Sequence, residues 1–349
     1  MPENLGRSLS RKNLIRGVIF FTLCTLGGLC LSFLWSGVQD IGRVLRTMQV
    51  ENLLLAGLCM FADWICGSLR FYIFVSKMSP KVTFADSLRA NLATLCVSGV
   101  TPFQTGGVGH LYIFMRTGVP LSGAVTTGII CFLGTLSILM LSAGYVLWLD
   151  PPFLPRGITL VSRYSLLVFM LVFTGFLLLL LKPRIIQSPL KGLAAFLATR
   201  FPFIGTRFER ITVKLEALIT EHQAFTRLFI SHHKGTCVLG LLLTLGFFAC
   251  RFVGGYVVVK ALGGSATLWE MSVAGMILNF VTLFAPSPGA SGIAEITSVL
   301  LMKNLMRPEL VGLWTLLTRF FTVYCAVGIG GVVLGSQLTK DLKANETAS

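Results

Sequence analysis

Charged residues are scarce in this sequence. Asp, Glu, Lys and Arg make up 12% of the 349 residues, whereas hydrophobic residues make up 54% and the mean hydropathy is +0.81. Soluble domains carry about 25% charged residues. The composition therefore excludes a soluble fold and indicates a polytopic membrane protein, and no segment is polar enough and long enough to form a second, soluble domain.

Recognised catalytic motifs are also missing. The sequence contains no P-loop, no His-Glu-x-x-His and no Gly-x-Ser-x-Gly motif, and neither a histidine cluster nor paired carboxylates. Nine cysteines lie scattered through apolar segments without metal-ligand spacing, as is typical of small buried hydrophobic residues. We therefore expect no metal, no cofactor and no enzymatic activity. A membrane enzyme that acts on a lipid phosphate or a glycosyl donor is the alternative.

Negative charge is scarcer than positive charge. The chain has 29 Lys and Arg against 14 Asp and Glu, a formal net charge of +15. The basic residues lie between apolar runs and near the termini, with nine in 182–234 against three Glu. This pattern is typical of cytoplasmic loops rather than of a nucleic-acid surface. We expect contact with anionic lipids and no nucleic-acid partner.

Six apolar runs are long enough to cross a bilayer, which takes about 20 helical residues. They are Leu14–Leu34, Leu53–Val75, Leu121–Leu149, Leu160–Leu181, Val238–Val259 and Leu310–Leu334. The predicted fold class is an all-α polytopic membrane protein with one integral domain over 1–349. Its first half is 10–181, an amphipathic cytoplasmic linker follows at 182–234, and its second half is 235–340.

Two further apolar stretches are broken, by TPFQTGG at 101–107 and by PSPGASG at 286–292. Each arm is too short to span alone, so we predict re-entrant helical hairpins at 84–118 and 265–303. A first hairpin that enters and returns also keeps the basic linker on the cytoplasmic side. The two hairpins then enter from opposite sides, as in an inverted repeat, although no residue-level repeat is evident.

Polar residues at membrane depth are costly and mark binding sites. The candidates for substrate binding are Thr101, Gln104, Thr105, Gly106, Gly107, His110, Arg116, Ser287, Ser291, Glu295 and Arg319. The breaks are attributed to Pro102, Pro286, Pro288, Gly289 and Gly292. Asp63 and Arg251 are candidates for a charge relay.

The four charged residues inside apolar helices each have two interpretations. Glu295 either binds a cationic headgroup or a proton, or it caps its half-helix and pairs with Arg319. Arg319 is either that buried partner or a contact for lipid phosphate. Asp63 and Arg251 either form a structural ion pair, or they relay protons and meet phosphate.

For three other basic side chains, a role other than substrate binding is the first expectation. Arg70 and Arg116 lie near the cytoplasmic ends of apolar arms, where snorkelling to lipid phosphate is the expected role and substrate capture the second. His110 follows the paired glycines and could titrate near neutral pH. A single histidine in such a position is more often a structural group.

The two breaks resemble those of the lysylphosphatidylglycerol synthase transmembrane-region family. The resemblance includes Tyr112 after the first break, Glu295 after the second and Arg319 near the end of the chain, and it extends over roughly residues 10–340. Two positions depart from the pattern. Many relatives place an acidic residue and a proline after the paired glycines, where this chain has Val108 and Gly109, so we expect the first hairpin to handle a different headgroup or proton step.

The resemblance implies a function. In bifunctional members a comparable region translocates aminoacylated phosphatidylglycerol, which a separate soluble domain makes. We find no such domain within this sequence and expect a free-standing flippase for a phospholipid or a polyprenyl or glycolipid, in a prokaryotic cytoplasmic membrane. Anionic or phosphate-bearing lipids and a lipid-modifying enzyme are the expected partners. A non-transporting scaffold of a lipid-synthesis complex is a further alternative.

The charge pattern makes a topological prediction. Single cysteines placed in 182–234 and at either terminus of a cysteine-free variant are expected to react with impermeant maleimide only from the cytoplasmic side. Labelling of sealed inverted and right-side-out vesicles measures this. Reaction of the linker from the outer side would contradict the re-entrant first hairpin.

Overall fold

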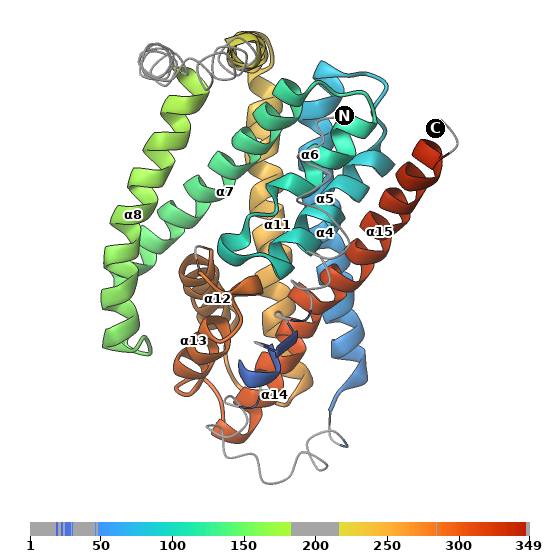
Figure 1. The fold of residues 1–349 in the computed structure, drawn as a ribbon. Coiled ribbons are helices and arrows are strands. Elements are labelled where there is room, and N and C mark those ends of the chain that lie inside the picture. The colour runs from blue at the N-terminus through green and yellow to red at the C-terminus, as the bar shows by residue number, and fades with distance from the viewer. Residues whose placement is uncertain are drawn as a thin grey trace, which may run out of the picture.

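The computed structural model describes residues 48–182, 216–283 and 285–346, together with residues 19, 22, 23, 25–28, 30 and 46. These residues form helices and no strand (Figure 1). Five helices are long and apolar enough to cross a membrane. They are α4 (Val50–Met78), α7 (Leu121–Leu149), α8 (Arg156–Leu181), α11 (Lys234–Ala261) and the helix formed by α14 (Pro308–Arg319), η4 (Phe320–Tyr324) and α15 (Cys325–Glu346). The sixth expected span, Leu14–Leu34, falls largely outside the described residues.

Each broken stretch forms two short helices joined by a single 3-10 turn. The first stretch comprises α5 (Phe84–Val100), η1 (Pro102–Gln104) and α6 (Gly107–Arg116). The second comprises α12 (Leu268–Thr282), η3 (Pro288–Ala290) and α13 (Ile293–Met302). Figure 1 shows the first pair in the upper half of the molecule and the second in the lower half. The two turns meet where the N–H of Phe103 donates to the carbonyl of Ala285 at 3.0 Å.

Both stretches begin with a capping box. Thr83 accepts a hydrogen bond from the N–H of Asp86, whose carboxylate accepts from the N–H of Thr83 at 3.0 Å. Thr267 and Glu270 repeat this exchange, with the Thr267 N–H 2.7 Å from the carboxylate. Such a cap contributes about 1 kcal/mol and determines where a helix starts. The short arms therefore have defined outer ends.

The two breaks are alike in backbone conformation as well as in sequence. The pattern Ser/Thr-Pro-x-x-Ser/Thr-Gly occurs at 101–106 and at 287–292. In each, an extended residue precedes the proline and the residue after it is left-handed: Phe103 has φ 54° and ψ 21°, and Gly289 has φ 57° and ψ 19°. The turns diverge at the next position, where Ala290 is left-handed as well. A six-residue repeat is thus present that inspection of the sequence alone missed.

Packing between helices follows the same correspondence. Helix α4 packs on α5 as α11 packs on α12, and α6 packs on α7 as α13 packs on α14. Across the halves, α5 contacts α15 as α12 contacts α7, while α4 and α11 contact each other directly. The two halves therefore pack through corresponding pairs of helices. Helix α8 packs on α7 and α12 and has no counterpart in the second half among the described helices.

The described part of the linker, 216–234, lies against the start of α7. Ser122 donates to the Glu221 carboxylate at 2.6 Å, and the Thr126 hydroxyl lies 2.7 Å from Nδ1 of His222. Burial lowers the pKa of His222, so its ring is neutral at this contact. The rest of the predicted amphipathic linker lies outside the described residues.

The two left-handed turn residues predict opposite effects of substitution. Gly289→Ala is expected to lower the free energy of unfolding by about 1–2 kcal/mol, because a Cβ clashes with the backbone in this conformation. Phe103→Gly removes the same clash and is expected to raise it by about 1 kcal/mol. Thermal unfolding in detergent measures both. Equal effects of the two substitutions would contradict the shared geometry.

Candidate functional site

A cavity of about 250 Å³ lies between α11, α12 and α14. It reaches the C-terminal end of α5, next to the first break, and η3 in the second break. Ser98 and Gly99 at the end of α5, and Gly289 in η3, form part of its wall. Aromatic and aliphatic side chains line most of the rest. Three arginines also line it: Arg70, Arg251 and Arg319. The described lining residues include no acidic side chain.

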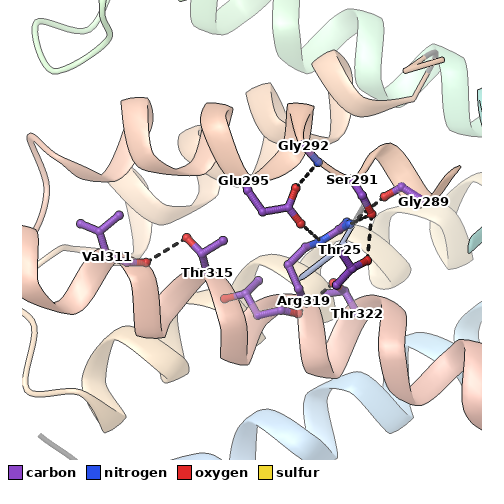
Figure 2. A network of polar contacts seen from close by, with 10 residues as sticks. Thr25, Gly289, Ser291, Gly292, Glu295, Val311, Thr315, Arg319 and Thr322 are labelled. Atoms are coloured by element: carbon purple, nitrogen blue, oxygen red, sulfur yellow. Dashed lines mark hydrogen bonds and ion pairs between the residues drawn. The ribbon is translucent and has the colours of Figure 1, made fainter. Parts of the chain in front are cut away.

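Arg319, on α14, holds the second break in place (Figure 2). Its Nε donates to Oε1 of Glu295 at 3.0 Å, and both side chains are buried, with 8% and 1% of their surface exposed. Its Nη2 donates to the carbonyl of Gly289 at 2.8 Å and to Oγ of Ser291 at 3.2 Å. The guanidinium therefore satisfies a backbone carbonyl that the break removes from helical hydrogen bonding.

Glu295 connects this arginine to the start of α13. Its Oε2 accepts from the N–H of Gly292 at 2.5 Å, which caps the helix. Part of the N-terminal region covers the network, since the Thr25 and Ser291 hydroxyls lie 3.0 Å apart and a Cβ at Gly28 would lie 3.0 Å from Oε2. The structure thus contains the capping and pairing that were one interpretation of Glu295.

Asp63 and Arg251 form a second buried ion pair, between α4 and α11. Nη2 of Arg251 lies 3.2 Å from Oδ2 of Asp63, whose side chain is 1% exposed. Nη1 of Arg251 donates to Oδ1 of Asn279 at 3.1 Å, and its guanidinium carbon lies 4.4 Å from the ring centroid of Phe247. The pairing interpretation is therefore present, with Arg251 facing the cavity and Asp63 behind it.

Arg70 was expected to snorkel to the membrane surface, and this expectation was wrong. Its Nη1 donates to Thr135 at 2.8 Å and to Thr244 at 3.3 Å, and its guanidinium carbon lies 5.5 Å from the ring centroid of Phe247. These groups on α7 and α11 give the side chain polar and aromatic partners inside the protein. One sequence signal could have revealed it: Arg70 lies two helical turns after Asp63, on the same face of α4.

The threonines of the first break satisfy local backbone. The Thr101 hydroxyl donates to the carbonyl of Val97 at 2.6 Å, and that of Thr105 donates to the carbonyl of Pro102 at 3.3 Å. Gly106 is needed for packing, because a Cβ there would lie 2.0 Å from Oγ of Ser98. None of these predicted residues lines the cavity.

The remaining candidates whose side chains are described are also absent from the cavity lining. His110 is buried against Phe71, with ring centroids 5.1 Å apart, and Arg116 donates to the carbonyl of Gln337 at 2.8 Å at the far end of α6. The others are turn residues in or beside the two breaks: Pro102, Gln104, Gly107, Pro286, Ser287, Pro288 and Gly292. The structure therefore brings together Arg251, Gly289 and Arg319 of the predicted set, with Glu295 and Ser291 directly behind Arg319.

A family model described as the lysylphosphatidylglycerol synthase TM region matches residues 14–330. The chain belongs to this family. The match covers both breaks, both ion pairs and all three cavity arginines. A "UPF0104 membrane protein" of Archaeoglobus fulgidus is 24% identical over 298 residues, which are 83% of this chain and 89% of the relative. The resemblance inferred from the two motifs is thereby confirmed.

The buried pair of Glu295 and Arg319 makes a prediction about stability. Arg319→Met strands a carboxylate that is 1% exposed and is expected to lower the free energy of unfolding by about 3–5 kcal/mol. The double variant Glu295→Gln/Arg319→Met is expected to recover part of this loss, because it leaves no buried unpaired carboxylate. The recovery is incomplete because the Gly289 carbonyl still lacks its donor. Thermal unfolding in detergent tests this. A double variant no more stable than Arg319→Met would argue against the pair.

Proposed function

We propose that this protein is a lipid translocase in which a phosphate-bearing headgroup crosses through the arginine-lined cavity while the acyl chains remain in the bilayer. The observation that carries the proposal is the position of the cavity. It lies where the two broken stretches meet, and three guanidinium groups face it. Transporters of several folds bind their substrates at such breaks.

Helix lengths support re-entrant hairpins. Helices α5, α6, α12 and α13 have 17, 10, 15 and 10 residues, whereas a span takes about 20. Each pair therefore enters and returns on the same side, and the two pairs enter from opposite sides. In the long helices, side chains such as Leu141, Leu171 and Val332 are 73–75% exposed, as expected of surfaces that face lipid. We place the protein in the cytoplasmic membrane with both termini inside.

The lining chemistry supports a phosphate ligand. Guanidinium groups bind phosphate through paired, charge-assisted hydrogen bonds, and these strengthen where water is excluded. The apolar remainder of the wall lowers the local dielectric. The described lining residues offer no carboxylate or histidine that could act as a general base, so the chemistry favours binding and passage over hydrolysis.

Purified protein in vesicles tests the proposal. With headgroup-labelled fluorescent phosphatidylglycerol, wild-type protein is expected to expose nearly all of the label to external dithionite, whereas protein-free vesicles expose about half, the outer leaflet. Pro288→Ala/Gly289→Ala is expected to suppress this movement, because it favours a regular helix at the break. Only vesicles that contain folded, monodisperse protein are compared.

A matched control changes the same residue types elsewhere. Pro152→Ala/Gly157→Ala alters one exposed position in the loop between α7 and α8 and another in the first turn of α8, and it is expected to leave lipid movement unchanged. Folded wild-type protein that moves no lipid would contradict the translocase and leave the scaffold as the better account. Release of phosphate or sugar from a lipid donor would instead identify an enzyme.

A further inference from the structure

We propose that the cavity selects a headgroup with one net negative charge, namely a phosphodiester of an uncharged alcohol, and that Arg70 determines this selection. The inference rests on the proposed function, because it specifies which lipids the same site takes. It follows from the charges around the cavity: three arginines line it, and two carboxylates pair with two of them, so one positive charge is left.

Two of the three cavity arginines are neutralised from behind. Asp63 pairs with Arg251 at 3.2 Å and Glu295 pairs with Arg319 at 3.0 Å. Both carboxylates are 1% exposed and lie outside the cavity lining. Each arginine therefore presents a guanidinium to the cavity while its pair contributes no net charge.

Arg70 forms no ion pair with a described carboxylate. The charge of Asp63 also acts on Arg70, but it is already paired with Arg251, so one carboxylate faces two arginines. Its hydrogen bonds go to the hydroxyls of Thr135 and Thr244, which donate in turn to backbone carbonyls of their own helices at 3.1 and 2.7 Å. Its Nε is buried without a described hydrogen-bond partner. One positive charge is thus left at a largely apolar cavity, where a bound anion would balance it.

Phe247 contacts the Arg70 guanidinium as well as the paired guanidinium of Arg251. The guanidinium carbons of Arg70 and Arg251 lie 5.5 and 4.4 Å from the centroid of the same ring. Contact with one aromatic ring keeps both groups at the same part of the wall and limits their motion. A phosphate in the cavity can accept from a guanidinium of this wall, and Arg70 supplies the charge that no carboxylate compensates.

The same charges disfavour other headgroups. A zwitterionic headgroup leaves the excess positive charge unbalanced, and a cationic one adds to it. No described carboxylate lines the cavity to receive an ammonium group. Unpaired like charges in a site of low dielectric discriminate strongly between ligands. The site therefore favours an anionic lipid over aminoacylated ones.

Native mass spectrometry of full-length protein in detergent tests this. The probe is an equimolar mixture of phosphatidylglycerol, phosphatidylcholine and lysyl-phosphatidylglycerol with identical acyl chains. Wild-type protein is expected to bind phosphatidylglycerol about tenfold more than either other lipid, which is about 1.4 kcal/mol. Arg70→Gln is expected to bring the three within about twofold of one another, since one charge-assisted contact is lost. Equal binding of the three lipids by wild-type protein, or an unchanged preference in Arg70→Gln, would overturn the proposal.

Two further variants separate charge from folding. Arg70→Lys keeps the positive charge and is expected to keep the preference, whereas Arg163→Gln removes a charge from the exposed face of α8 and is expected to match wild type. Arg70→Gln strands no described carboxylate, and thermal unfolding in the same detergent verifies that it is folded. A loss of preference in Arg163→Gln equal to that in Arg70→Gln would also overturn the assignment.

Soluble glycerol 1-phosphate distinguishes a lipid from a free phosphate ester. It is expected to displace bound phosphatidylglycerol only at far higher concentration, because it lacks the acyl chains. Displacement at equal concentration would overturn the lipid assignment. The binding measurement needs no transport, so the two proposals fail separately: selective binding without lipid movement contradicts the translocase and supports this site, and movement of all lipids without selective binding contradicts this site alone.

Discussion

The backbone groups released at two helix breaks have to find partners inside an apolar protein, and the rest of the architecture follows from how they do so. An unsatisfied peptide group costs several kcal/mol in hydrocarbon. Here the breaks face each other, with the N–H of Phe103 donating to the carbonyl of Ala285, and Arg319 takes up the carbonyl of Gly289. Because Arg319 is charged, it needs Glu295, and the polar site therefore results from a backbone requirement.

The two halves solve this requirement differently although their turns are alike. The first break is satisfied by hydroxyls of nearby threonines, whereas the second uses an ion pair that links three segments distant in sequence. The residue three positions after Gly292 is Glu295, but the residue three positions after Gly106 is Gly109. A Cβ at Gly109 would lie 2.6 Å from the backbone of Ala93. The first hairpin is thus tightly packed where the second is charged.

Much of this could be predicted from sequence because the physical signals were local. The lengths of the apolar runs identified the five described spans, and proline and glycine identified both breaks. Because charges are scarce in apolar helices, the sequence also suggested that Asp63 pairs with Arg251 and Glu295 with Arg319. The partners of Arg70 could not be predicted in this way. Its environment comes from Thr135 and Thr244, on two other helices, and helix rotation within a bundle leaves only a weak trace in an almost uniformly apolar sequence. The meeting of the turns was likewise a tertiary contact between residues 182 positions apart.

The contact between the breaks is made by main-chain atoms alone, and this affects what genetics can detect. The hydrogen bond from Phe103 to Ala285 involves neither side chain, so the bond itself does not depend on the residue type at either position. Alanine scanning would pass over this junction, and comparisons of sequences would give it little weight. Replacing the amide of Phe103 by an ester, which removes the donor and leaves the side chain intact, is the kind of change that reaches it.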